Sequence, residues 1–150
     1  FVLPRKLYAA TQKKLRKVSP LTADYLIDNL QGTLKAVSLV NETALNTAFS
    51  NDQAADLVFA QQVLGLAEGR DAVMGITTSG NSANVIHALN VAKAKGATTI
   101  ALTGQSGGKI KAVADVTICA PSNETYKIQE YHLPIYHALC IAVEEEFFGE

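Results

Sequence analysis

The 150-residue sequence contains no tryptophan, a single methionine and only two cysteines, Cys119 and Cys140. Two thiols in apolar stretches give little reason to expect a disulfide, so we expect both to be reduced residues of the core. Charged side chains are also scarce, at 18% of the sequence, whereas an average soluble domain has about 25%. This shortage favours a surface that is partly buried against other subunits, and hence a homo-oligomer.

Long hydrophobic runs are missing as well. No stretch approaches the ~18 apolar residues of a membrane span, and none has the pattern of a secretory signal, which predicts a cytoplasmic protein without membrane contact. The formal net charge is only -1, and the basic residues gather between Arg5 and Lys17 without a matching aromatic platform, since Tyr8 is the single aromatic residue there. We therefore interpret that segment as a solvated helix or arm, and we expect no nucleic-acid partner.

Residues 1–33 are predicted to form this basic helical or arm segment, and residues 34–150 the rest of a single domain. Short apolar runs predict strands at residues 34–39, 71–76, 98–103 and 116–120. Apolar residues at helical spacing predict helices that begin at a cap in residues 50–52, at residue 83 and at about residue 125. Strands that alternate with helices imply an α/β fold with a parallel sheet.

A hydroxyl-rich loop follows the second of these predicted strands. Its residues are Thr77, Thr78, Ser79, Gly80, Asn81 and Ser82. Ligands of open parallel sheets bind beyond the carboxyl ends of the strands, where free N–H groups at helix N-termini attract anions. The loop lacks both the Gly-Lys-Ser/Thr ending and the G-x-G-x-x-G spacing of nucleotide sites, so it favours a compact phosphate ester. The alternative is an ordinary turn with a Ser cap, and the Asn81 amide could cap the helix or meet a sugar hydroxyl.

The final predicted helix carries Gln129, His132 and His137. At about 100° per residue, Gln129 lies about 60° from His132 and about 80° from His137 around the axis, so one broad face can present all three. His132 is either a partly exposed helix residue or a functional one. His137 sits among apolar residues, where a buried imidazole needs a polar partner, and is the better catalytic candidate. His87 is expected to serve packing or the surface.

Several motifs occur together in this chain. They are Gly75-Ile76-Thr77-Thr78-Ser79-Gly80-Asn81-Ser82-Ala83-Asn84-Val85, then Leu102-Thr103-Gly104 with Gly107-Gly108-Lys109, then Ile128-Gln129-Glu130 with His132 and His137. This combination resembles the phosphoheptose isomerases of the sugar isomerase (SIS) domain superfamily, over about residues 34–145. The resemblance implies a flavodoxin-like three-layer αβα sandwich, with residues 34–150 as the SIS domain. It also implies a homotetramer with sites between subunits.

The same resemblance implies a reaction, the interconversion of sedoheptulose 7-phosphate and D-glycero-D-manno-heptose 7-phosphate through an enediol. The Ser/Thr loop would hold the phosphate, and Asn51 and Asp52 match a family pair near the substrate. His137 matches a histidine that acts as an acid or base or as a zinc ligand, and Gln129 matches a glutamine that faces the same centre. Both are therefore candidate catalytic residues and candidate zinc ligands.

Two features depart from that family pattern. The family's Gly-Asn-Gly-Gly-Ser loop, the helix with His and Glu that follows it, and the first strand of the sheet have no match in this sequence. We therefore expect the sequence to lack the N-terminal portion of the domain. Tyr126 stands where some relatives have an aspartate near the substrate. The alternative function is a non-catalytic SIS module that binds a sugar phosphate or a partner protein, as do replication-initiation factors that resemble these isomerases.

Overall fold

The computed structural model describes residues 5–149. Contacts within the chain group residues 5–37 with residues 135–149, and residues 38–134 form a second compact unit. Residues 1–4 of the predicted basic arm and residue 150 of the predicted SIS domain lie outside the described residues. The predicted domain boundary after residue 33 stays a prediction.

The unit of residues 38–134 is built on a parallel sheet. Its strands are β1 (Ala72–Ile76), β2 (Thr98–Thr103) and β3 (Val116–Cys119), hydrogen-bonded in the order β1-β2-β3. Gly75 lies opposite Ala101, and Ala101 lies opposite Thr117. Helical crossovers place consecutive strands side by side in the same direction, which confirms the predicted α/β fold with a parallel sheet.

The prediction of a strand at residues 34–39 is wrong. Residues 34–38 have no regular secondary structure, and a 3-10 helix, η1, spans Leu39–Asn41. An apolar run becomes a strand only where a neighbouring strand satisfies its backbone groups. The described sheet offers no such neighbour to this segment, and Val37 is 55% exposed.

The helix predicted to begin at residues 50–52 is also misplaced. Helix α3 spans Thr43–Asp52, so Asn51 and Asp52 end a helix instead of capping one. The Ser50 hydroxyl donates back to the carbonyl of Asn46 at 2.6 Å, within the helix, where it cannot cap a following one. The next elements are the 3-10 helix η2 (Ala55–Leu57) and α4 (Val58–Leu66).

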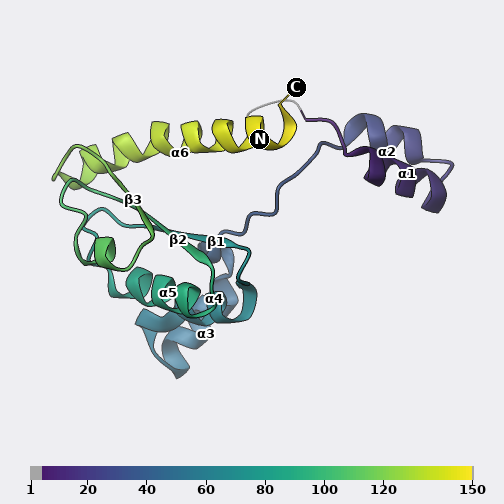
Figure 1. Ribbon diagram of the computed structural model, residues 1–150. Coiled ribbons are helices and arrows are strands. Elements are labelled where there is room, and N and C mark those ends of the chain that lie inside the picture. Colours follow the sequence, from purple (N-terminus) through teal and green to yellow (C-terminus); the bar gives the residue numbers. More distant parts are fainter. Residues whose placement is uncertain (1–4, 150) are drawn as a thin grey trace. The chain divides into compact units, whose positions relative to one another are not determined.

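Helices α4 and α5 (Ala83–Ala94) cover one face of the sheet, and the first turns of α6 (Thr125–Phe148) lie on the other side (Figure 1). Leu89 of α5, Ala101 of β2 and Ile110 of the 3-10 helix η3 (Lys109–Ala112) are fully buried together. Gly75 is required here because a Cβ atom would lie 2.6 Å from a methyl carbon of Val85. Close packing of α5 therefore determines where its N-terminus meets the loop after β1.

The two cysteines are free, as expected, but both are exposed, so their assignment to the core is wrong. Cys119 is the last residue of β3, which has a neighbouring strand on only one side in the described sheet. Cys140 lies on α6, where most nearby side chains are also exposed. An apolar sequence context therefore did not guarantee burial, because burial depends on which elements cover the residue.

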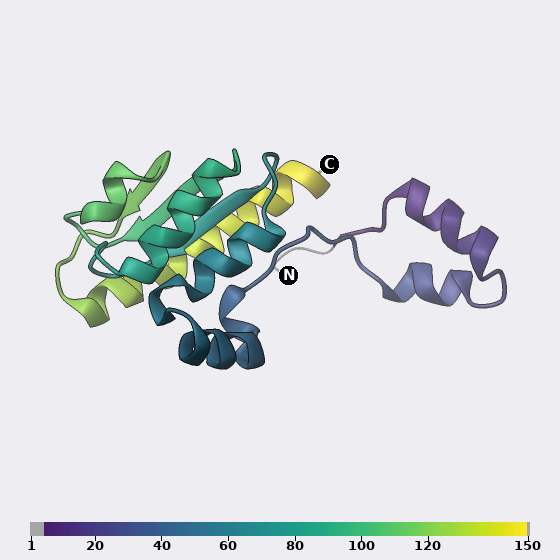
Figure 2. The ribbon, with the colours of Figure 1, turned by 90° about the horizontal axis from the view of Figure 1, so that it is seen from below.

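In the other unit, α1 (Ala9–Val18) and α2 (Ala23–Asn29) form a helical pair joined by a short turn (Figure 2). The guanidinium of Arg5 lies 3.4 Å from the carboxylate of Glu144 on α6, and both side chains are buried. The Tyr8 and Phe148 rings stack with centroids 5.3 Å apart. No helix within residues 5–149 combines the length and apolar character needed to cross a membrane.

Candidate functional site

The hydroxyl-rich loop, residues 77–82, connects the carboxyl end of β1 to the N-terminus of α5, and we call it the cradle. Ser82 is the N-cap of α5, yet its hydroxyl makes no cap bond and lies 2.8 Å from the hydroxyl of Thr77. The first-turn N–H groups of Ala83 and Asn84 find no protein acceptor within the part of the chain that the structure describes. Free N–H groups at a helix start, beside exposed Ser79, make an anion-binding environment.

A second glycine-rich loop, residues 104–109, packs directly against the cradle. Gly80 and Gly108 have positive φ angles of 67° and 55°. A Cβ atom on either would collide with backbone of the other loop, at Gly107 for Gly80 and at Ser79 for Gly108. The Ile110 N–H donates to the Gly80 carbonyl at 2.9 Å. The second loop therefore closes one side of the cradle.

The side chain of Asn81 links these two loops. Its amide nitrogen donates to the Ser79 carbonyl at 3.0 Å, and its oxygen accepts the Lys109 N–H at 3.1 Å. Sequence left its role open between a helix cap and a sugar contact, and the observed bonds are neither. Asn81 holds the shape of the cradle, and its assignment to substrate binding stays a prediction.

The first turns of α6 meet the sheet at Gly104, which directly follows β2. The Gly104 N–H donates to the Thr78 carbonyl at 3.0 Å. A Cβ atom on Gly104 would lie 2.5 Å from the Cδ1 atom of Ile128 on α6. Gln129 follows Ile128 and is exposed. Helix α6 thus brings Gln129 to the same end of the sheet as the cradle.

The burial of the two helix histidines is the reverse of what the sequence suggested. His132 is buried, with 5% exposure, and its Nε2 atom lies 3.3 Å from the Thr103 carbonyl oxygen. His137, expected among buried apolar neighbours, is exposed, and its ring meets that of Tyr136 edge-on at 4.8 Å between centroids. It belongs to the unit of residues 5–37 and 135–149. Its role beside the cradle therefore stays a prediction.

Asn51 and Asp52 are exposed at the end of α3. No hydrogen bond or ion pair joins their side chains to the cradle within residues 5–149, so their substrate role stays a prediction. Of the two roles expected for His87, packing or the surface, the structure favours the surface, since its side chain is 42% exposed and its Nε2 atom lies 3.5 Å from a carboxylate oxygen of Asp56.

Two charged clusters perturb pKa values near the sheet. At the amino end of β2, Asp115 accepts a hydrogen bond from Lys93 at 2.8 Å and bonds from the N–H and hydroxyl of Thr99. These bonds hold the pKa of the Asp115 carboxyl well below its usual range. At the start of α6, a hydrogen bond to Glu124 raises the pKa of the Tyr126 hydroxyl. Asp115 stabilises the end of the sheet opposite the cradle.

The predicted zinc ligands do not form a complete metal centre. Structural and catalytic zinc ions take three or four protein ligands in tetrahedral geometry. Gln129 and His137 offer two donor atoms, and the described residues contain no group of three or more His, Cys, Asp or Glu side chains that could hold a metal ion. A zinc ion would therefore need further ligands besides Gln129 and His137, and its presence stays a prediction.

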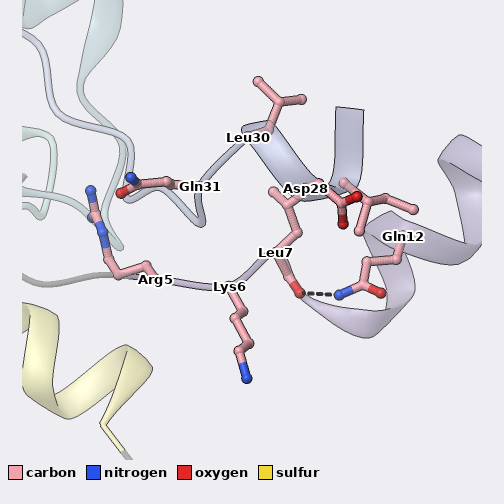
Figure 3. Close-up of a pocket in the computed structure, with 8 residues that line it drawn as sticks. Arg5, Lys6, Leu7, Gln12, Asp28, Leu30 and Gln31 are labelled. Carbon is pink, nitrogen blue, oxygen red and sulfur yellow. Dashed lines mark hydrogen bonds between the residues drawn. The ribbon is translucent and has the colours of Figure 1, made fainter. Parts of the chain in front are cut away.

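A pocket of about 570 Å³ lies in the other unit, around the start of α1 and the end of α2 (Figure 3). Its lining residues are Arg5, Lys6, Leu7, Gln12, Ile27, Asp28, Leu30 and Gln31. The Gln12 side chain donates to the Leu7 carbonyl at 2.9 Å across it. None of its residues belongs to the cradle, to a strand or to a loop that follows a strand, where ligands of open parallel sheets bind. The cradle is therefore the better candidate site.

Comparison with known proteins is consistent with this choice. The SIS domain family model matches residues 39–143. The chain is 47% identical over 116 residues to phosphoheptose isomerase of Trichlorobacter lovleyi, covering 77% of this chain and 59% of that protein. It is 43% identical over 130 residues to probable phosphoheptose isomerase of Thermoplasma acidophilum, covering 87% and 70%. The solved phosphoheptose isomerase of Neisseria gonorrhoeae has a TM-score of 0.72 at 38% identity, covering 90% of this chain and 70% of that one.

Proposed function

Because this chain belongs to the SIS domain family, and within it to the phosphoheptose isomerases, we propose that the protein is an aldose–ketose isomerase of sugar phosphates. The proposed reaction interconverts sedoheptulose 7-phosphate and D-glycero-D-manno-heptose 7-phosphate. The chain spans 59% and 60% of the length of two curated relatives, from Trichlorobacter lovleyi and Citrifermentans bemidjiense. The observation that carries the proposal is the cradle, where hydroxyls and free N–H groups converge at the start of α5.

The cradle is proposed to bind the phosphate of the sugar. The exposed Ser79 hydroxyl and the N–H groups of Ala83 and Asn84 supply donors, and the dipole of α5 favours the negative charge. The hydrogen bond between Thr77 and Ser82 keeps the two ends of the loop together. Binding a remote phosphate in this way orients the carbonyl end of the sugar for reaction.

His137 is proposed as one of the proton-transfer groups. Aldose–ketose exchange moves a proton between adjacent carbons and also moves protons on their oxygens, through an enediol. A neutral imidazole can take a proton and return it near neutral pH. The amide of Gln129 is proposed to donate a hydrogen bond to a substrate oxygen as negative charge develops there.

A homotetrameric, cytoplasmic enzyme is part of the proposal. Large apolar side chains exposed on α6 support an oligomer, because such surface is normally covered. They include Tyr131, Leu133, Ile141, Val143 and Phe147. Sedimentation of the intact protein at micromolar concentration should show the tetramer, and a monomer would overturn it. Zinc, with Gln129 and His137 among its ligands, is also a prediction, and elemental analysis of the purified protein tests it.

A phosphosugar-binding module without catalysis is the second candidate. One observation favours it. Residues 77–110 by themselves form the cradle and the loop that supports it, and neither proposed catalytic side chain lies among them. The intact protein should be incubated with sedoheptulose 7-phosphate and the products separated by chromatography. Appearance of the aldose form supports the isomerase. Saturable binding of the ketose without any conversion would overturn it in favour of the binding module.

A further inference from the structure

His132 is a buried polar side chain that no step of the proposed reaction uses. Its Nε2 atom lies 3.3 Å from the Thr103 carbonyl oxygen, and a carbonyl only accepts, so Nε2 carries the hydrogen. The same carbonyl already accepts the Ala120 N–H at 2.8 Å. The histidine is therefore not needed to satisfy the strand end, and its bond instead fixes where α6 lies.

The bond reaches the corner of the fold that supports the cradle. Thr103 ends β2, and the next residue, Gly104, donates its N–H to Thr78 in the cradle at 3.0 Å. Ile128 packs on Gly104 so closely that a Cβ atom there would lie 2.5 Å from its Cδ1 atom. Successive turns of α6 thus contact the corner, first through Ile128 and then through His132. Two contacts at different points along its axis determine both the position and the rotation of a helix.

Gln129 lies between these two contacts on α6. We propose that His132 is a positioning residue of the isomerase, which sets the rotation of α6 and so the place of Gln129 relative to the cradle through its bond to Thr103. The inference rests on the proposed function. His132 does not touch the substrate in this role. A mutation remote from the chemistry that misplaces a catalytic group by about 1 Å can cost on the order of 100-fold in rate.

Kinetics of the intact protein can separate positioning from simple structural support. His132→Leu replaces the N–H donor with an apolar side chain of similar bulk, whereas His132→Gln keeps a side-chain N–H donor. We expect the Leu variant to lower kcat at least about 10-fold and up to about 100-fold, with KM and the affinity for inorganic phosphate within a few-fold. The Gln variant should recover most of kcat. His87→Leu, which removes a surface histidine of α5, is the matched control.

Two outcomes of that series would overturn the inference. One is an unchanged kcat in His132→Leu. The other is a parallel loss of kcat, phosphate affinity and thermal stability in both variants, as expected of a purely structural residue. If the wild-type protein shows no turnover, the proposed function fails, and amide hydrogen exchange tests the positioning role alone. His132→Leu should then speed amide exchange over residues 125–134 and leave exchange in β1 unchanged. His132→Gln should exchange like the wild type over residues 125–134. Equal exchange in the wild type and both variants would refute the positioning role.

Discussion

The hydroxyl oxygens of Thr77 and Ser82 lie 2.8 Å apart, so a hydrogen bond joins the two ends of the cradle. Ser82 thereby gives up the usual bond of an N-cap serine to its own helix. The first N–H groups of α5 stay available for an external anion. The position of the loop and its hydroxyls thus supports a phosphate site that needs no lysine.

Loss of two cradle hydroxyls should weaken phosphosugar binding. We expect Ser79→Ala combined with Ser82→Ala to lower affinity at least ~10-fold, or about 1.4 kcal/mol, because one hydroxyl donor to the phosphate is removed and the bond from Ser82 to Thr77 that joins the two ends of the cradle is lost. Calorimetric titration with sedoheptulose 7-phosphate measures the change. Ser38→Ala, which removes an exposed hydroxyl outside the cradle, should bind like the wild type. Equal affinity in the double variant and in this control would show that the phosphate binds elsewhere.

A methyl group on Gly80 should damage the cradle. Gly80→Ala forces a residue with a Cβ atom into a left-handed conformation, which costs roughly 1–2 kcal/mol, and also drives that atom into the Gly107 carbonyl. We expect lower stability in urea unfolding and weaker phosphate binding. Gly65→Ala is the matched control because a Cβ atom in α4 meets nothing within 4 Å. That change should stabilise the protein by about 0.5–1 kcal/mol, and a destabilised Gly65→Ala with a tolerated Gly80→Ala would contradict the described loop.

Stability should depend on pH through Asp115. Its carboxyl pKa is depressed in the folded state, first by Lys93 and then by Thr99, from an ordinary value of 3.8. The folded state therefore binds this proton more weakly than the unfolded state, and the stabilisation is complete above the ordinary pKa. It is lost progressively as the pH falls through that value toward the folded pKa.

The measurement is a series of urea midpoints for the wild type and Asp115→Asn. The wild type should be more stable near neutral pH, and the difference should shrink as the solution becomes more acidic than about pH 4. Asp28→Asn, which removes the same charge from an exposed position on α2, is the control. A difference between wild type and Asp115→Asn that stays constant down to pH 2 would contradict the proposed role of the Asp115 carboxylate.

Removal of the His137 imidazole should abolish most turnover. General acid–base groups typically contribute about 10²–10⁴-fold, so His137→Ala should lower kcat by that order in the intact protein. Phosphosugar affinity should stay within a few-fold, since the cradle supplies the phosphate contacts. His87→Ala, on the surface of α5, should keep normal turnover. Wild-type kcat in His137→Ala would remove this residue from the mechanism.

The sequence by itself determined the elements whose signals are local. The apolar runs at residues 71–76, 98–103 and 116–120 became the three parallel strands, with the hydroxyl-rich loop directly after the first. The long final helix with its histidines was also predicted. These predictions succeeded because periodicity, turn residues and helix starts depend on neighbours along the chain.

Tertiary structure alone decided which of those residues are buried and what they contact. The run at residues 34–39 resembled a strand but has no strand beside it, and Cys119 and Cys140 proved exposed. Asn81 turned out to link two loops, and His132, not His137, is the buried histidine of α6. Burial and partnership arise from contacts between segments distant in sequence, such as Thr103 with His132. No local pattern can supply those contacts, because they depend on how helices pack on the sheet.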